Sequence, residues 1–194
     1  MSDAFIAQAA LAAALAWGAG LRLYAVVFAL GLLGRSGGVE LPESLAVLSH
    51  PLVLVGSGVL TLAEFVGDKI PLVDSLSDTV QTFIRIPAGA ALAAAVFGDS
   101  SGAMQTLAAL AGGGFAATSH VAKAGSRALI NTSPEPVSNV AASLGEETLL
   151  GAGLWLALVH PLAFLGALGV FLVATLWMLR RLWHWLTRRP ARTL

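Results

Sequence analysis

The stretch HVAKAGSRALINTSPEP, from His120 to Pro136, decides how the rest of the chain is interpreted. It places His120, Lys123, Arg127 and Asn131 at positions i, i+3, i+7 and i+11, which share one face of an α-helix. Two prolines follow, and they predict a break between this helix and the next. So much polarity needs an explanation, because the surrounding sequence is strongly apolar.

The composition indicates a membrane protein. Of 194 residues, 57% are hydrophobic and 11% are charged, with a mean hydropathy of +0.81. Soluble domains carry about 25% charged residues. The zero net charge gives no sign of a nucleic-acid partner. The absence of cysteine excludes disulfides, thiolate metal sites and cysteine nucleophiles. The start lacks the basic region of a signal peptide, so we expect the first apolar run to be retained.

A membrane-spanning helix needs about 20 mainly apolar residues. We predict five membrane segments, at 4–33, 45–66, 74–97, 103–130 and 148–185. Polar residues at 18–22 interrupt the first segment, and Pro161 is expected to kink the last one. A short helix ending at Gly145 is expected between the fourth and fifth segments. The fold class is therefore an all-α integral membrane protein, in which the segments beginning after Pro71 and Pro134 look broken or re-entrant.

Two further patterns concern orientation and symmetry. The C-terminal end is rich in arginine, at Arg180, Arg181, Arg188, Arg189 and Arg192. By the positive-inside rule, this end is expected in the cytoplasm, with a transmembrane domain at 1–187 and a basic tail at 188–194. Segments 46–60 and 156–170 share His-Pro-Leu. This similarity is either chance among Ala/Leu/Gly-rich helices or a trace of an internal inverted repeat, as in many transporters.

A second polar stripe complements the first. Asp74, Asp78, Gln81 and Arg85 are spaced i, i+4, i+7 and i+11, again on one helix face. An unpaired charge at the centre of a bilayer costs at least about 2.5–3.5 kcal/mol. We therefore expect the acidic stripe, extended by two nearby carboxylates, to face the basic stripe in a shared polar interior. The alternative is that these charges form purely architectural ion pairs or touch water at the membrane interface.

The proline break adds a second argument for a binding site. Ser133 followed by Pro134 is typical of a helix start, and a helix N-terminus presents free N–H groups to anions. Together with the basic stripe, this predicts a site for a phosphate or carboxylate group. The candidate substrate-binding residues are His120, Lys123, Arg127, Asn131, Ser133 and Arg85. The candidate proton-coupling residues are Glu64, Asp68, Asp74 and Asp78.

The polar segments also carry a resemblance to a family. GLRLYAVVFALGLLGR, EFVGDKIPLVDSLSDTVQTFIR and HVAKAGSRALINTSPEPVSNVAASLGEE together resemble an uncharacterised bacterial multi-pass membrane family, domain of unknown function 4126. The resemblance covers roughly residues 15–161. It implies an integral membrane protein, and hence the bacterial cytoplasmic membrane, but it supplies no activity or ligand.

These observations favour a small transporter or flippase-like permease for an anionic substrate, a lipid phosphate included. At this length a homodimer is expected, with glycines at 98, 102, 166 and 169 as contact faces. One alternative is an intramembrane enzyme that acts on a lipid head group, with His120 and the carboxylates as acid–base groups. Another is a non-catalytic scaffold or assembly factor. No spacing indicates a metal site or a cofactor.

Overall fold

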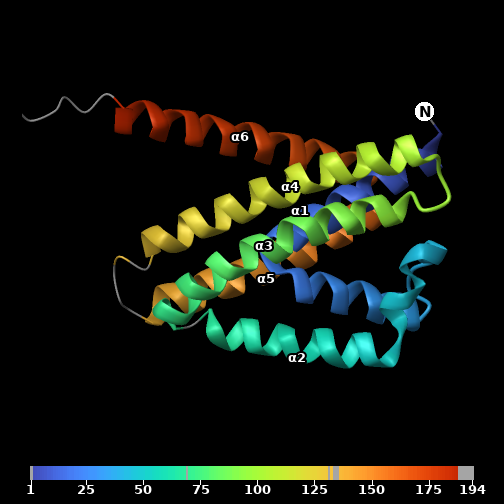
Figure 1. The fold of residues 1–194 in the computed structure, drawn as a ribbon, viewed down its shortest axis with the longest axis horizontal. Coiled ribbons are helices and arrows are strands. Elements are labelled where there is room, and N and C mark those ends of the chain that lie inside the picture. The colour runs from blue at the N-terminus through green and yellow to red at the C-terminus, as the bar shows by residue number, and fades with distance from the viewer. Residues whose placement is uncertain (1, 69, 131, 133–135, 188–194) are drawn as a thin grey trace, which may run out of the picture.

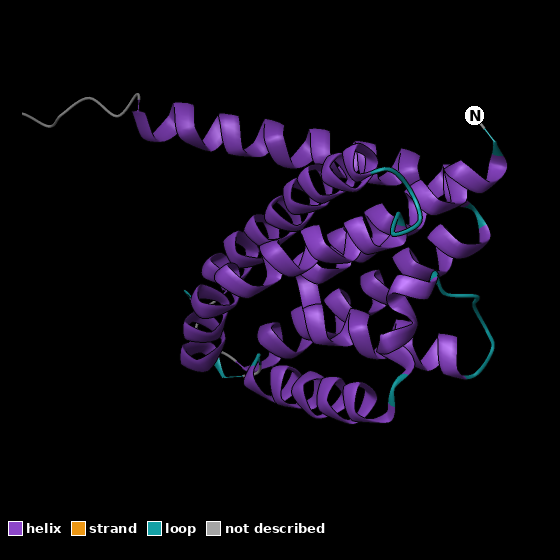
Figure 2. Ribbon diagram, turned by 45° about the vertical axis from the view of Figure 1, so that its right-hand side comes forward, coloured by secondary structure: helices purple, strands orange, loops and turns teal. Residues whose placement is uncertain are grey.

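The computed structural model describes residues 2–68, 70–130, 132 and 136–187, giving the backbone alone for 71–75, 136, 185 and 186. This described part is helical, without strands (Figure 2). Its elements are α1 Asp3–Arg35, the 3₁₀ helix η1 Glu43–Ser49, α2 Pro51–Gly67, α3 Pro71–Val96, α4 Gly102–Ile130, α5 Pro136–Val159 and α6 Pro161–Thr187. Four helices are long and apolar enough to cross a membrane, and the bent η1–α2 pair provides a fifth candidate. The chain is an all-α membrane protein, as the sequence predicts.

Helix α1 lies at the centre of the bundle. It contacts every other helix, with α3 and α4 against one side and α2 and α6 at opposite outer edges of the view (Figure 1). Every residue from Ala10 to Leu23 is buried, so α1 is enclosed on all sides for several turns. A helix without a polar face is suited to this position because its whole surface can be covered by neighbouring helices.

The central helix is interrupted at Arg22, within the polar segment that the sequence marked. Arg22 has φ −150° and ψ 85°, which is not helical. Non-helical backbone at membrane depth is tolerated where protein groups satisfy it. Helix α4 supplies these groups: Ser119 Oγ donates to the carbonyl of Trp17 at 2.7 Å, and Lys123 Nζ donates to the carbonyl of Leu21 at 3.3 Å. The polar face of α4 therefore provides hydrogen-bond donors for backbone carbonyls near the break in α1.

Small residues bring α1, α3 and α4 close together. A Cβ added at Gly20 of α1 would lie 2.0 Å from Ser119 Oγ and 2.2 Å from the Ala116 carbonyl oxygen. One added at Gly112 of α4 would lie 2.4 Å from the Cβ of Ala93 in α3. Close backbone approach through small residues is characteristic of membrane helix packing. It places the polar stripes of α3 and α4 beside the break in α1.

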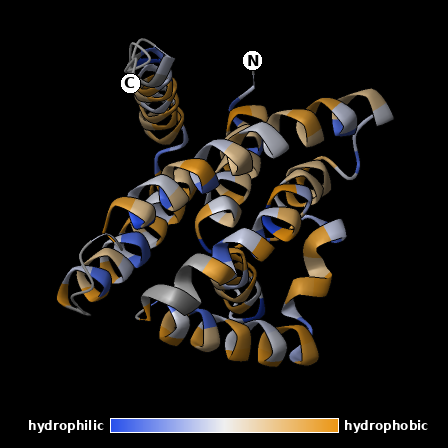
Figure 3. Ribbon diagram, turned by 60° about the vertical axis from the view of Figure 1, so that its left-hand side comes forward, coloured by the Kyte–Doolittle hydropathy of each residue, from blue (hydrophilic) through white to orange (hydrophobic). Residues whose placement is uncertain are grey.

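The outward faces of the helices are apolar. Figure 3 shows hydrophobic residues along these faces, and the same pattern appears in the exposed side chains. Examples from four helices are Leu52, Phe83, Leu110, Leu129, Val170 and Val173. In water such a surface would be an aggregation hazard, whereas a lipid bilayer accommodates it.

Two boundaries differ from the prediction. Helix α5 is continuous from Pro136 to Val159, so Gly145 does not end a short helix. A Cβ at Gly145 would meet no atom within 4 Å, and this glycine is simply an open position on the helix. The predicted single segment 148–185 is also wrong, because the chain breaks at His160 into α5 and α6.

Both His-Pro pairs begin helices. Pro51 and Pro161 are the first residues of α2 and α6, where proline is favoured because its missing N–H would have no helical partner. His50 precedes α2, and its Nδ1 accepts a hydrogen bond from the N–H of Leu52 at 3.3 Å. The η1–α2 pair bends by 66° at this point. The prolines therefore redirect the chain more strongly than a kink within one helix would.

Candidate functional site

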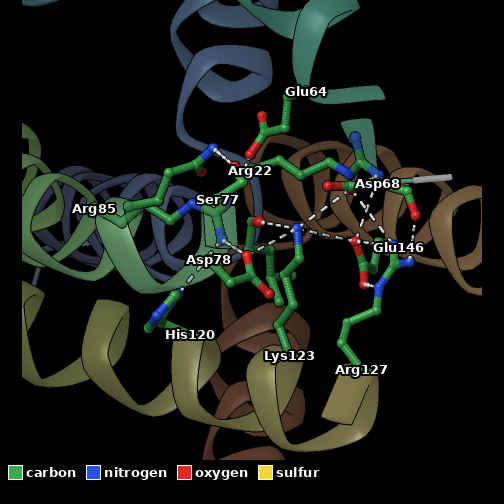
Figure 4. A network of polar contacts seen from close by, with 12 residues as sticks. Arg22, Glu64, Asp68, Ser77, Asp78, Arg85, His120, Lys123, Arg127 and Glu146 are labelled. Carbon is green, nitrogen blue, oxygen red and sulfur yellow. Dashed lines mark hydrogen bonds and ion pairs between the residues drawn. The ribbon is translucent and has the colours of Figure 1, made fainter. Parts of the chain in front are cut away.

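The buried charged residues gather around the break in α1. Figure 4 shows them reaching into one space from α1, α2, α3, α4 and α5. Asp68, the residue after the last turn of α2, occupies the centre. Its Oδ2 accepts a hydrogen bond from Arg22 Nη2 at 2.6 Å and lies 3.4 Å from both Lys123 Nζ and Arg127 Nη2. Three cations thus share a single carboxylate oxygen.

Glu146 of α5 provides a second shared carboxylate. Arg127 donates to it through two nitrogens, with Nε–Oε1 at 2.8 Å and Nη2–Oε2 at 3.1 Å. The same Oε2 lies 3.4 Å from Lys123 Nζ and 3.5 Å from Arg22 Nη2. Ser143, nearly one turn earlier on α5, accepts a hydrogen bond from Arg22 at 2.7 Å. The paired geometry of Arg127 and Glu146 is the strongest arrangement open to a guanidinium and a carboxylate.

Arg85 of α3 organises the other half of the cluster. It pairs with Glu64 of α2 and, through Nη1, with Asp78 Oδ1 at 3.1 Å. The imidazole of His120 lies beside it, with Nδ1 3.4 Å from Arg85 Nη1 and Nε2 2.6 Å from Thr82 Oγ1. Asp78 and Arg85 belong to the same predicted stripe, so this stripe is partly paired within its own helix.

Lys123 joins the two halves. Its Nζ lies 3.3 Å from the Leu21 carbonyl oxygen, 3.4 Å from Asp68 Oδ2, 3.4 Å from Glu146 Oε2 and 3.7 Å from Asp78 Oδ1. These distances exceed the 2.6 Å of the shortest contact of Arg22. Lys123 is therefore shared among several acceptors and held closely by none of them.

The cluster balances its charges. Within the described residues it contains four cations, Arg22, Arg85, Lys123 and Arg127, and four carboxylates, Glu64, Asp68, Asp78 and Glu146. The side chains of the cations are at most 2% exposed. Glu147 adds a peripheral carboxylate, 38% exposed and 3.5 Å from Arg22. Removing one partner of a buried pair typically costs about 3–5 kcal/mol, since the other charge stays behind without compensation.

A cavity of about 300 Å³ adjoins this cluster between α3 and α4. Its lining residues are Asp78, Thr79, Thr82, His120, Ala124, Arg127 and Ala128. The volume is at the lower end of the range of about 300–1,000 Å³ for small-molecule sites. The cavity therefore reaches both an anion and a cation of the cluster.

Comparison with known proteins identifies the family of the chain. The family model described as domain of unknown function (DUF4126) matches residues 9–181. The chain belongs to this family. No curated protein and no solved structure matches the chain significantly. The DUF4126 assignment confirms the resemblance carried by the polar segments, and those segments are the ones that build the charged cluster.

The structure brings together six of the ten predicted site residues of this DUF4126 chain. These are Glu64, Asp68, Asp78, Arg85, Lys123 and Arg127. His120 joins them through hydrogen bonds. Asn131, Ser133 and the side chain of Asp74 lie outside the described residues, as do the Ser133–Pro134 helix start and the tail at 188–194.

Sequence reasoning missed part of the cluster on α5. Asn139, Ser143 and Glu146 are spaced i, i+4 and i+7, so they form a third polar stripe on one helix face. Asn139 and Ser143 are fully buried, and Asn139 Oδ1 accepts a hydrogen bond from Arg127 at 3.3 Å. Ending the helix at Gly145 separated Glu146 from this stripe and concealed the pattern.

Proposed function

We propose that this protein is a small membrane permease, a transporter or flippase, for a substrate that it binds through an anionic group. Phosphate and carboxylate groups, the phosphate of a lipid included, fit this description. The supporting observation is the charge-balanced cluster beside a cavity at the break in the central helix. Ionisable residues and interrupted helices within membrane proteins commonly mark substrate and ion pathways.

Binding would proceed by exchange. The N–H groups of Arg127 are directed at Glu146, Asp68 and Asn139. Glu146 is the most exposed of the four carboxylates, at 12% for its side chain compared with 1–8% for the other three. An incoming anionic group would take the place of Glu146 on Arg127. Glu146 is the carboxylate that is displaced most easily, because it is already the least buried of the four.

Coupling to protons is assigned to Glu64, Asp68 and Asp78. Glu64 and Asp78 support this part of the proposal, because each has one buried carboxylate oxygen that no described residue contacts through a hydrogen bond. A proton on such an oxygen would give it a donor and would reduce the negative charge facing Arg85. Asp68 would respond through the three cations that it holds.

We place the protein in the bacterial cytoplasmic membrane as a homodimer, with the C-terminal end of α6 on the cytoplasmic side. Arg180 and Arg181 support this orientation, and the exposed Trp177 beneath Arg181 is typical of a membrane interface. Gly166 and Gly169 support a dimer contact on α6, since added Cβ atoms there would meet no atom of this chain within 4 Å.

The test is transport in proteoliposomes. Purified protein would be assayed for uptake of labelled phosphates and carboxylates and for movement of fluorescent phospholipids between leaflets. Arg127→Lys should reduce the flux at least about ten-fold, because lysine keeps the charge but loses the two-nitrogen geometry. Arg181→Lys at the end of α6 is the matched control and should leave the flux intact. A broad panel without any protein-dependent flux would contradict the proposal.

Each cation of the cluster has a carboxylate within 4 Å, and this pairing favours one competing role, that of a scaffold in which the ion pairs only fix helix register. Exchanging the partners, with Asp78→Lys and Lys123→Asp, separates the two roles. The pair spans 3.7 Å in the native chain, so the exchange keeps this contact and the net charge of the cluster. It also places like charges at the contacts with Arg85 and Asp68, so thermal unfolding is measured to establish that the variant folds. A scaffold should retain its phenotype after the exchange, whereas a permease should fold and lose its flux. Lipid turnover in detergent, abolished by His120→Ala, would instead support the intramembrane enzyme.

A further inference from the structure

We infer that the substrate is zwitterionic, with an ammonium group that binds Asp78 in addition to the anionic group that binds Arg127. This inference rests on the proposed function and narrows its substrate class. Both residues line the same cavity, Asp78 from α3 and Arg127 from α4. The cavity lining thus offers opposite charges to one small molecule.

Only one of the two carboxylate oxygens of Asp78 accepts a hydrogen bond from the described residues. Its Oδ1 accepts a hydrogen bond from Arg85 at 3.1 Å and lies 3.7 Å from Lys123. Its Oδ2 is buried and has no hydrogen-bond partner in the described part of the chain. The residue is 6% exposed, and its side chain reaches toward α4 between His120 and Lys123 (Figure 4). An ionised carboxylate accepts hydrogen bonds at both oxygens, so this cavity-lining residue keeps one buried acceptor, Oδ2, vacant.

Thr82 and His120, which line the cavity beside Asp78, have other hydrogen-bond partners. Thr82 donates its hydroxyl proton to the Asp78 backbone carbonyl at 2.9 Å. His120 is engaged with Thr82 and faces Arg85. An ammonium group on a molecule in the cavity would give Oδ2 a donor, through a charge-assisted hydrogen bond.

The balance of charges leads to the same substrate class. Among the described residues, four cations already face four carboxylates, and the partly exposed Glu147 adds a fifth carboxylate at the edge of the cluster. A purely anionic molecule would add an uncompensated negative charge to a buried space, which is strongly unfavourable. A zwitterion adds no net charge and contributes one partner to Asp78 and one to Arg127.

Matched ligand pairs test this inference. Binding to the purified protein would be measured by calorimetry for glycerophosphoethanolamine against the ethyl ester of glycerol phosphate, and for β-alanine against propionate. Each pair shares its anionic group and differs in the ammonium. At least one zwitterion should bind about ten-fold or more tightly than its matched anion, since a hydrogen bond to a charged group has about this effect.

Asp78→Asn provides the decisive variant. Asparagine keeps an oxygen for Arg85 and places an NH₂ donor where Oδ2 stood, so the preference should reverse toward the matched anion. Glu147→Gln is the charge-matched control. It removes one negative charge 3.5 Å from Arg22, outside the lining of the cavity, and should keep the preference for the zwitterion. Size-exclusion chromatography and thermal unfolding would establish that both variants fold.

Two transport measurements distinguish the source of the ligand. Leaflet exchange of phosphatidylethanolamine, but not phosphatidylglycerol, would assign the site to a lipid head group. Uptake of free glycerophosphoethanolamine or β-alanine would assign it to a soluble zwitterion. Equal or tighter binding of both anions would overturn the inference and leave anion binding intact. No binding and no flux for any of these compounds would overturn the inference together with the proposed function.

Discussion

Asp68 is the residue on which the stability of the cluster depends most. Its Oδ2 lies 2.6 Å from Arg22 and 3.4 Å from both Lys123 and Arg127. Asp68→Asn preserves the shape but leaves four cations facing three carboxylates in this part of the structure. We expect the free energy of unfolding to fall by about 3–5 kcal/mol, the cost of an uncompensated buried charge. Because the environment is apolar, added salt should restore little of this loss.

The measurement is equilibrium unfolding in mixed micelles, followed by circular dichroism. Glu147→Gln is the matched control, since it removes a carboxylate that is 38% exposed and contacts Arg22 at 3.5 Å. It should cost no more than about 1 kcal/mol. Adding Lys123→Met to Asp68→Asn restores neutrality and should recover about 2 kcal/mol of the loss. If Asp68→Asn costs no more than Glu147→Gln, or Lys123→Met adds to the damage, the argument from charge balance is wrong.

Three further predictions concern the break and the cavity. Gly20→Ala should lower the free energy of unfolding by about 1–3 kcal/mol through overpacking, because the new Cβ would lie 2.0 Å from a side-chain oxygen of α4. Gly114→Ala is the control: its Cβ would meet no atom within 4 Å, so it should raise the free energy of unfolding by about 0.5–1 kcal/mol. Ser119→Ala should cost about 1–3 kcal/mol in the same unfolding assay, because its 2.7 Å hydrogen bond serves a buried carbonyl at the break. Ala124 lines the cavity, whereas Val121 lies on the outer face of α4. A cysteine introduced by Ala124→Cys should therefore react faster with a water-soluble maleimide than one introduced by Val121→Cys, and equal rates would contradict a water-accessible cavity.

The sequence was sufficient to predict the helical membrane fold and the pairing of charges. Apolar length predicted the segments that became α1, α3 and α4, and the 3.6-residue period placed Asp78 and Arg85 on one face and Lys123 and Arg127 on another. The cost of burying a lone charge required these faces to find partners. That argument identifies the charges that need a partner, but it does not identify the partner, because several carboxylates in the chain could neutralise each cation.

The partners that were missed depended on tertiary structure. The polar residues at 18–22 indicated an interruption of α1, but they did not specify whether the Arg22 side chain turns into the protein or extends to the membrane surface. Glu146 was separated from Ser143 by a glycine that is typical of a helix end but here lies in mid-helix. Whether a glycine ends a helix depends on what packs beside it, and this information is absent from one segment read alone.

The packing of the helices indicates how a closed cluster could admit a substrate. Three of its cations sit on α1 and α4, which pack tightly against each other and against α3 through small residues. Three of its carboxylates sit on or just after α2 and α5, which pack mainly on α1 and make only slight contact with α3 and α4, respectively. A small outward movement of α5 would withdraw Glu146 from Arg127 without disturbing the α1–α3–α4 core. The same ion pairs that stabilise the closed state would then supply the free cation that an anionic group requires, so a structural role and a transport role for these residues are compatible.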